Sequence, residues 1–260
     1  TGAPEPHRNL EAATGQVTEA VTPELTDRLL VRAGERSDLS MEVLLLTAAV
    51  RAVSRWLGLD TVLVGMESHG RHDFGDGMDV SSVIGWFTAA YPLLTALDSQ
   101  GDLATDLKNI KNARQSVPND GVGFGALKTL HPDDAVRARM ATVAEPHFGF
   151  NYFGKLDPGA ESPIFSGFDA PLPFGRSPQT RRPNALELNV LHRGPGLSFR
   201  WTFSREIHAA SEVAALARAT IAELQAIAEL LDSDSTFLTP SDFPLAGLDQ
   251  GELDDLLGDE

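Results

Sequence analysis

The chain has 260 residues, enough for one large or two small domains, and its 42% hydrophobic and 22% charged residues are typical of a globular protein. It contains no cysteine, which excludes disulfide scaffolds, thiolate zinc sites and cysteine nucleophiles and fits a reducing compartment. Its net charge of −16 argues against nucleic acid or an anionic membrane surface as the main partner.

The N-terminal part of the chain alternates between strand and helix patterns. Residues 1–15 carry prolines and glycines and are expected to be a linker. A strand is predicted over 16–21, and the Thr22-Pro23 pair then begins a helix that runs to about residue 32. The pattern next predicts a helix that begins after Ser40 and ends at Gly58, with one apolar face formed by Val43, Leu46, Val50, Val53 and Leu57.

The middle of the chain adds three strands and one helix. The apolar run TVLVGM, residues 61–66, predicts a buried strand, and residues 86–94 predict another. An amphipathic helix is expected over 102–116, and a further buried strand over 148–153.

The C-terminal part begins with a hairpin and ends in a long helix. The hairpin arms are residues 186–191 and 197–203, and the long helix is residues 209–231. Because strands and helices interleave along the chain, the predicted fold class is α/β, a mixed sheet covered by helices. The segment 158–183 holds six prolines, and a loop of that length is usually functional or mobile.

The end of the chain is acidic. Residues 241–260 include seven acids and no base, so we divide the chain into the linker 1–15, a domain over 16–238 and an acidic linker or docking tail over 239–260. A solvated linker is favoured there over a short docking helix, for which the apolar residues are Leu245, Leu248, Leu253, Leu256 and Leu257. No apolar run is long enough to cross a bilayer and the first eight residues do not resemble a signal peptide, so we expect a cytoplasmic protein.

A polar cluster, Glu67-Ser68-His69-Gly70-Arg71-His72, follows the strand 61–66. A partly desolvated carboxylate at a strand end has a raised pKa and can act as a general base, which is the functional interpretation of Glu67. The alternative is a structural ion pair between Glu67 and Arg71, and the local pattern alone favours it.

Other kinds of site have weaker support. His69 and His72 would suit a metal on a helix, but Gly70 makes a helix improbable, and no metal site is expected. The glycines at 121, 123 and 125 do not have the dinucleotide-binding spacing. Asn151 and Tyr152 lie inside an apolar strand, where they are either hydrogen-bonded core residues or a pair lining a cavity.

Several motifs in chain order resemble those of the epimerization domains of nonribosomal peptide synthetases, which read roughly EGHGRE, TVGWFT-x-x-YP, P-x-x-G-x-GYG and FNYLG. The matching segments are ESHGRH at 67–72, VIGWFT at 83–88 with Tyr91-Pro92, PNDGVGFG at 118–125 and FNYFG at 150–154. Two further segments also match: LLLTA at 44–48 resembles the LLxA helix earlier in the family's domains, and TPSDF at 239–243 resembles the sequence that commonly follows them. In this chain Ser68 replaces a glycine and His72 a glutamate.

The resemblance implies one lobe of a chloramphenicol-acetyltransferase-like, condensation-type fold with two lobes and a tunnel between them. It implies epimerization at Cα of an aminoacyl or peptidyl thioester, carried on the phosphopantetheine arm of a peptidyl carrier protein, with no cofactor bound directly. The implied catalytic residues are Glu67, Arg71, Asn151 and Tyr152, with Arg71 orienting Glu67. The implied substrate-binding residues are His69, Trp86 and Tyr91.

The family's His-His-x-x-x-Asp-Gly motif belongs to the N-terminal lobe, and this chain has no His-His pair. We therefore expect the chain to be the C-terminal lobe, inactive without its N-terminal counterpart, with the acidic tail as a contact for a downstream synthetase module. The alternative is a catalytically incomplete platform that recruits a tailoring enzyme or a carrier protein.

Overall fold

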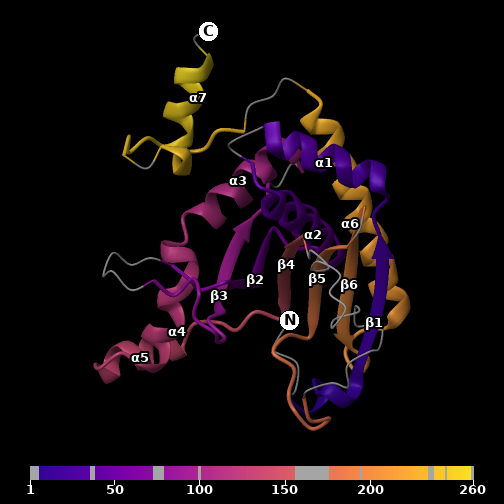
Figure 1. The fold of residues 1–260 in the computed structure, drawn as a ribbon, viewed down its shortest axis with the longest axis vertical. Helices are drawn as coiled ribbons and strands as arrows, with labels where there is room; N and C mark the ends of the chain where they lie inside the picture. The colour runs from indigo at the N-terminus through magenta and orange to yellow at the C-terminus, as the bar shows by residue number, and fades with distance from the viewer. Residues whose placement is uncertain are drawn as a thin grey trace.

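Six strands form one mixed sheet in the computed structural model, which describes residues 6–35, 39–72, 79–98, 101–155, 176–193, 195–233, 237–243 and 245–258. The sheet order is β1-β6-β5-β4-β2-β3 (Figure 1). The strands are β1 (Thr14–Ala20), β2 (Thr61–Ser68), β3 (Ala89–Ala96), β4 (Phe148–Lys155), β5 (Leu186–Arg193) and β6 (Gly196–Ser204). Strands β2, β4 and β5 run parallel to one another, so their carboxyl ends meet at one edge of the sheet, whereas the other neighbouring pairs are antiparallel.

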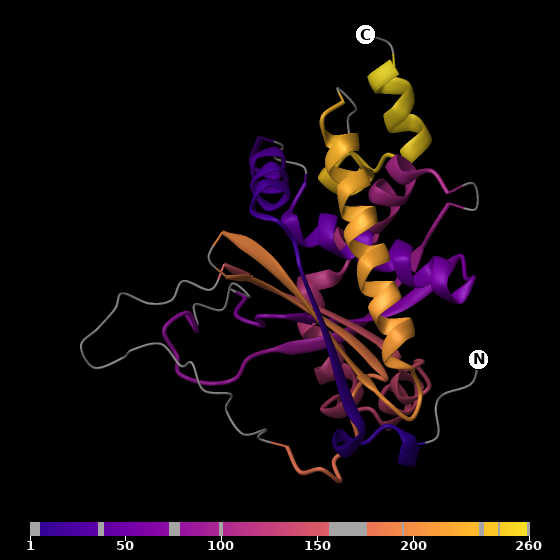
Figure 2. The same ribbon diagram turned by 90° about the vertical axis from the view of Figure 1, so that its right-hand side faces the viewer.

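The helices of the described chain are α1 (Pro23–Glu35), α2 (Met41–Leu57), α3 (Leu103–Gln115), α4 (Val122–Thr129), α5 (Asp134–Ala141), α6 (Ala210–Leu231) and α7 (Gln250–Gly258). Figure 2 shows α2 and α6 together on one side of the sheet. The predicted class, an α/β fold with a mixed sheet covered by helices, is confirmed. No helix among the described residues is long and apolar enough to cross a membrane.

The core lies between the sheet and its helical layer. Alternation along each strand sends one set of side chains into this core, as in β6, where the buried residues are Leu197, Phe199, Trp201 and Phe203. The alternate residues face the other side of the sheet, which we call the open face. On β2, β4 and β5 the open face carries Gly65, Glu67, Gly149, Asn151, Glu187 and Asn189, together with the apolar Leu63 and Leu191.

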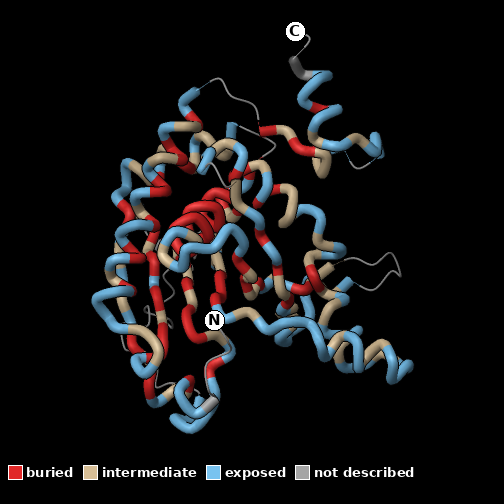
Figure 3. Tube along the Cα trace, turned by 180° about the vertical axis from the view of Figure 1, so that it is seen from behind, coloured by how far each residue is buried: buried red, intermediate tan, exposed pale blue. Residues whose placement is uncertain are grey.

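Helix α2 is buried along most of its length, as Figure 3 shows. Its ends are those that the sequence predicts: the Ser40 side chain accepts a hydrogen bond from the Val43 N–H, and Gly58 closes the helix in the left-handed region with φ of 65°. Leu57 was expected on the apolar face, but this residue of the last turn is 48% exposed.

The structure corrects several boundaries. The strand predicted over 86–94 is β3, which begins only at Ala89 and leaves Trp86 in the preceding loop. Helices α4 and α5 were not predicted, and most of the proline-rich segment 158–183 lies outside the described residues. In the acidic tail, α7 is a docked helix rather than a solvated linker: Leu253 is 3% exposed and Asp254 forms a 3.1 Å ion pair with Lys108 of α3.

Candidate functional site

Two polar side chains meet on the open face where the parallel strands β2 and β4 lie side by side. Met66 and Phe150 are register partners that point into the core, so the next residues, Glu67 and Asn151, share the open face. The Asn151 amide nitrogen donates a 3.0 Å hydrogen bond to Oε2 of Glu67. One oxygen of the carboxylate is thereby fixed relative to both strands.

Glu67 forms part of the wall of a cavity of about 520 Å³. The wall carries charges of both signs, which come from Lys128, Arg176, Arg181, Arg182, Glu67, Glu145 and Glu187. A concave site with a few polar groups around a carboxylate is the usual form of a small-molecule site. A substrate group bound in the cavity can therefore reach the Glu67 carboxylate.

The surroundings of Glu67 favour its protonated form. Partial burial raises the pKa of the Glu67 carboxyl, the neighbouring Glu187 carboxylate raises it further, and Arg176 opposes both effects. A carboxyl with a raised pKa both accepts and returns protons more readily near neutral pH. The arrangement therefore suits proton transfer to and from a group bound in the cavity.

Two glycines leave room for the side chain of Asn184, which lines the cavity. Gly65 of β2 and Gly149 of β4 are register partners on the open face, and the Asn184 side chain lies across both. A Cβ at Gly149 would lie 2.3 Å from the Asn184 amide nitrogen, so a larger residue there would displace Asn184. Sequence reasoning missed Asn184, because nothing near residue 184 in the chain indicates that it crosses two distant strands.

Arg71 is not a partner of Glu67, so both interpretations of Arg71 from the sequence are corrected. Its guanidinium donates hydrogen bonds to the backbone oxygens of Val80, Val83 and Gly85 at 2.5, 2.8 and 3.0 Å. It also lies 4.3 Å from the centre of the Phe87 ring. Arg71 thus holds the loop before β3 rather than the carboxylate, because the chain turns away from the sheet after Ser68.

Asn151 and Tyr152 were expected either to form a pair lining a cavity or to lie in the core. Strand alternation separates them: Asn151 reaches Glu67, and Tyr152 packs against the hydrophobic core on the other face. Burial raises the pKa of the Tyr152 hydroxyl.

The three expected substrate-binding residues lie apart. Tyr91 contributes to the cavity wall, but it is 4% exposed, and burial raises the pKa of its hydroxyl to about 12. Trp86 is 89% exposed on the loop held by Arg71. His69 is exposed outside the cavity, where its Nδ1 accepts a 2.9 Å hydrogen bond from the Arg71 N–H.

At two positions of the motifs, only glycine fits sterically. Gly70 has φ of 66°, and a Cβ there would lie 1.7 Å from the Phe87 oxygen. Gly121 has φ of 79°, and a Cβ there would lie 2.0 Å from the Tyr91 ring. These contacts tie the segments 67–72 and 118–125 to the neighbourhood of β3.

The fold is of the condensation-domain type. The chain belongs to the condensation domain family, whose model matches residues 3–243. It is 34% identical over 257 residues to one of the linear gramicidin synthase proteins of Brevibacillus parabrevis and 33% identical over 250 residues to surfactin synthase subunit 1 of Bacillus subtilis (strain 168). These alignments cover 98% and 94% of this chain but only 3% and 7% of the two synthases.

Solved structures share the fold over about half of their length. The epimerization domain from the third module of tyrocidine synthetase B matches with a TM-score of 0.75 and 28% identity, covering 86% of this chain and 49% of that chain. The X-domain in its complex with OxyB from teicoplanin biosynthesis matches with a TM-score of 0.63 and 16% identity, covering 90% and 50% respectively. The second likeness concerns the fold alone.

Proposed function

We propose that this chain provides one half of a domain that inverts Cα of an aminoacyl or peptidyl thioester in nonribosomal peptide synthesis. The observation that carries the proposal is the Glu67 carboxylate, held by Asn151 in the wall of an open cavity. The likeness to the epimerization domain of tyrocidine synthetase B, at a TM-score of 0.75, supports the choice of reaction.

In the proposed reaction Glu67 exchanges a proton with Cα of the bound thioester. Removing this proton from one face leaves an enolate, and a second group returns a proton to the opposite face, so the configuration changes while the bonds to the other substituents remain. Asn151 keeps the carboxylate in position for this transfer, which limits the reorganisation needed in the transition state. Tyr152 and Arg71 support the site by packing and by holding the loop before β3.

The second proton-transfer group is proposed to come from outside these 260 residues. By the family resemblance it would be a histidine of the N-terminal lobe, and this chain covers 49% of the epimerization-domain chain to which it is similar. The substrate would arrive on the phosphopantetheine arm of a peptidyl carrier protein. Glu67 needs no diffusible cofactor for this chemistry, because the thioester itself stabilises the enolate.

The test is Cα–H exchange in D₂O by a protein that joins this chain to an N-terminal lobe, with an aminoacyl thioester on a carrier protein. Mass spectrometry reads deuterium at Cα. Glu67→Gln keeps the size of the side chain and removes the proton acceptor, so we expect exchange to be abolished. Glu19→Gln, on the edge strand β1, is the matched control and should keep the wild-type rate.

Wild-type exchange in Glu67→Gln would remove Glu67 from its role. A joined protein that shows no exchange but binds a tailoring enzyme would overturn the epimerase proposal in favour of the recruitment platform.

A further inference from the structure

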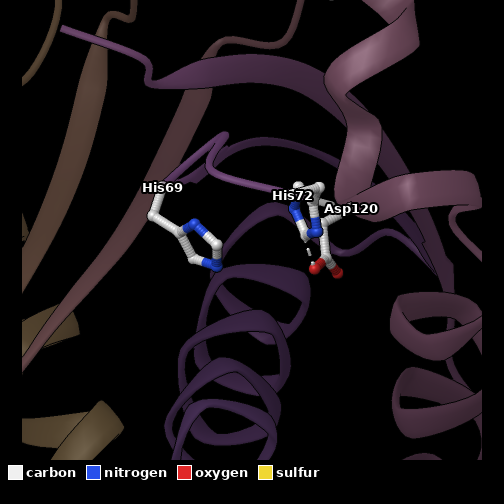
Figure 4. A group of neighbouring side chains, drawn as sticks. All are labelled: His69, His72 and Asp120. Carbon is white, nitrogen blue, oxygen red and sulfur yellow. Dashed lines mark ion pairs between the residues drawn. The ribbon is translucent and has the colours of Figure 1, made fainter. Parts of the chain in front are cut away.

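A second group of chemically active side chains lies outside the cavity of Glu67. His69 and His72 follow β2, and Asp120 lies in η3 (Pro118–Gly121), the turn before α4. Figure 4 shows His72 and Asp120 joined by an ion pair, with His69 to one side of them, although 48 positions separate His72 from Asp120. Each offers one ligand atom, and these atoms all lie within 4.8 Å of one another.

The hydrogen bonds that hold Asp120 do not use the oxygen that would bind a metal ion. Its Oδ1 accepts a 2.8 Å hydrogen bond from Nη1 of Arg114, and Arg114 in turn binds Glu42 through a 3.1 Å ion pair. The Ser68 hydroxyl donates to the Asp120 backbone oxygen at 2.8 Å. These contacts use Oδ1 and the main chain and turn Oδ2 toward His72, in the way that outer partners orient a ligating carboxylate.

One edge of a coordination shell already has the right length. Nε2 of His72 and Oδ2 of Asp120 are 3.3 Å apart. Ligand atoms held about 2.1 Å from a tetrahedral ion lie roughly 3.4 Å from one another. His69 must move closer by up to about 1.4 Å to complete a three-ligand face, and it is an exposed side chain.

The His69 ring makes two contacts that bear on this movement. It stacks on the His72 ring with 4.8 Å between centroids, so the two imidazoles are already neighbours. Its Nδ1 accepts the Arg71 N–H at 2.9 Å, which places the ring proton on Nε2. Binding of a metal at Nε2 uses the other neutral tautomer, with the ring proton on Nδ1, so the hydrogen bond from the Arg71 N–H is given up as the metal–nitrogen bond forms.

We propose that His69, His72 and Asp120 bind one divalent transition-metal ion, with Zn²⁺ as the best fit. Two imidazoles and one carboxylate are ligands that zinc accepts, and they leave a fourth position for water. The ion would join the chain that follows β2 to the turn before α4 and so brace the polar cluster that begins with Glu67. The site belongs to this chain in particular, since His72 stands where the EGHGRE motif has glutamate.

The test is titration of the full chain, without an affinity tag, with ZnCl₂ by calorimetry and with Co²⁺ by visible absorption. We expect one ion per chain, a Co²⁺ spectrum that reports nitrogen and oxygen ligands, and a higher melting temperature with zinc. His69→Gln and His72→Gln should each weaken binding at least about tenfold. His131→Gln, before α5, changes a histidine outside the cluster and should bind as the wild type does.

The possible outcomes distinguish a specific metal site from nonspecific metal binding. Circular dichroism first establishes that each variant is folded. Wild-type affinity in a folded double variant, His69→Gln with His72→Gln, would overturn the proposal, as would equal losses in His131→Gln or an absence of binding at millimolar zinc. None of these results bears on the role of Glu67, because Cα–H exchange is measured separately.

Discussion

The Asn151 amide and the Glu67 carboxylate form their hydrogen bond because they lie at the same level on two neighbouring parallel strands, β4 and β2. The sequence singles out both residues, from their strand positions and from motifs, but it groups Asn151 with Tyr152, which strand alternation sends to the other face. The partner of Arg71 could not be predicted in this way. Its guanidinium binds backbone oxygens of a loop nine to fourteen residues further on, and such contacts have no periodic signal.

Gly121 supports the site at the scale of a single residue. Its φ of 79° and the nearby Tyr91 ring leave no space for a Cβ. Gly121→Ala should therefore lower the free energy of unfolding by roughly 2–5 kcal/mol, through backbone strain and overpacking. Urea denaturation measures this value.

Gly123→Ala is the matched control two residues away. Gly123 lies in α4, and a Cβ there meets nothing within 4 Å. This substitution should raise stability by about 0.5–1 kcal/mol, because alanine favours the helix. Equal losses in both variants would contradict the steric account of Gly121.

At the scale of elements, the sequence predicts those whose burial is periodic. Strands β2, β4, β5 and β6 and helices α2, α3 and α6 each carry an apolar face that packs in the core, and all were predicted within a few residues of their ends. Helices α4 and α5 contain no buried residue, so no apolar stripe marks them in the sequence. The start of β3 was misplaced because Trp86 and Phe87 look like strand residues but belong to the loop that Arg71 holds.

Among the described side chains of α7, Leu253 is the buried one, and a few polar contacts add to it. Leu253 is 3% exposed, and Gln250 donates to the Leu238 backbone oxygen at 3.3 Å. Leu253→Asp would place a carboxylate in this apolar contact at a cost of about 2–3 kcal/mol, enough to release the helix.

We expect faster amide hydrogen exchange across 250–258 in Leu253→Asp, with exchange in the central strands unchanged. Leu256→Asp changes the same helix on its exposed side, where the leucine is 62% exposed, and should leave exchange as it is. Unchanged protection in both variants would mean that Leu253 does not hold α7.

At the scale of the whole molecule, the chain combines a strongly acidic composition with buried ion pairs. Arg51, which is 5% exposed, binds both Asp106 of α3 and Glu223 of α6, and so joins three helices. Such pairs are costly to break, because the remaining charge stays buried. The net charge of −16 gave no indication of this arrangement, since composition does not say which charges meet.

His208 should make the folded chain less stable as the pH drops through the range in which histidine titrates. Burial beside Trp56 lowers the pKa of His208 below 6.5, and Glu212 opposes the effect. Above 6.5 both the folded and the unfolded chain keep this imidazole neutral. Below it the unfolded chain takes up a proton more readily, so stability is lost as the pH falls toward the folded pKa.

The variant His208→Gln removes this titrating group while keeping a polar side chain in its place. Its free energy of unfolding, measured in urea at pH 7.5, 6.5 and 5.5, should decline less steeply than that of the wild type. One proton limits the difference in slope to about 1.4 kcal/mol per pH unit. Parallel slopes for the two proteins would show that His208 takes up its proton equally well in the folded and unfolded chain, and that burial beside Trp56 does not hold it neutral.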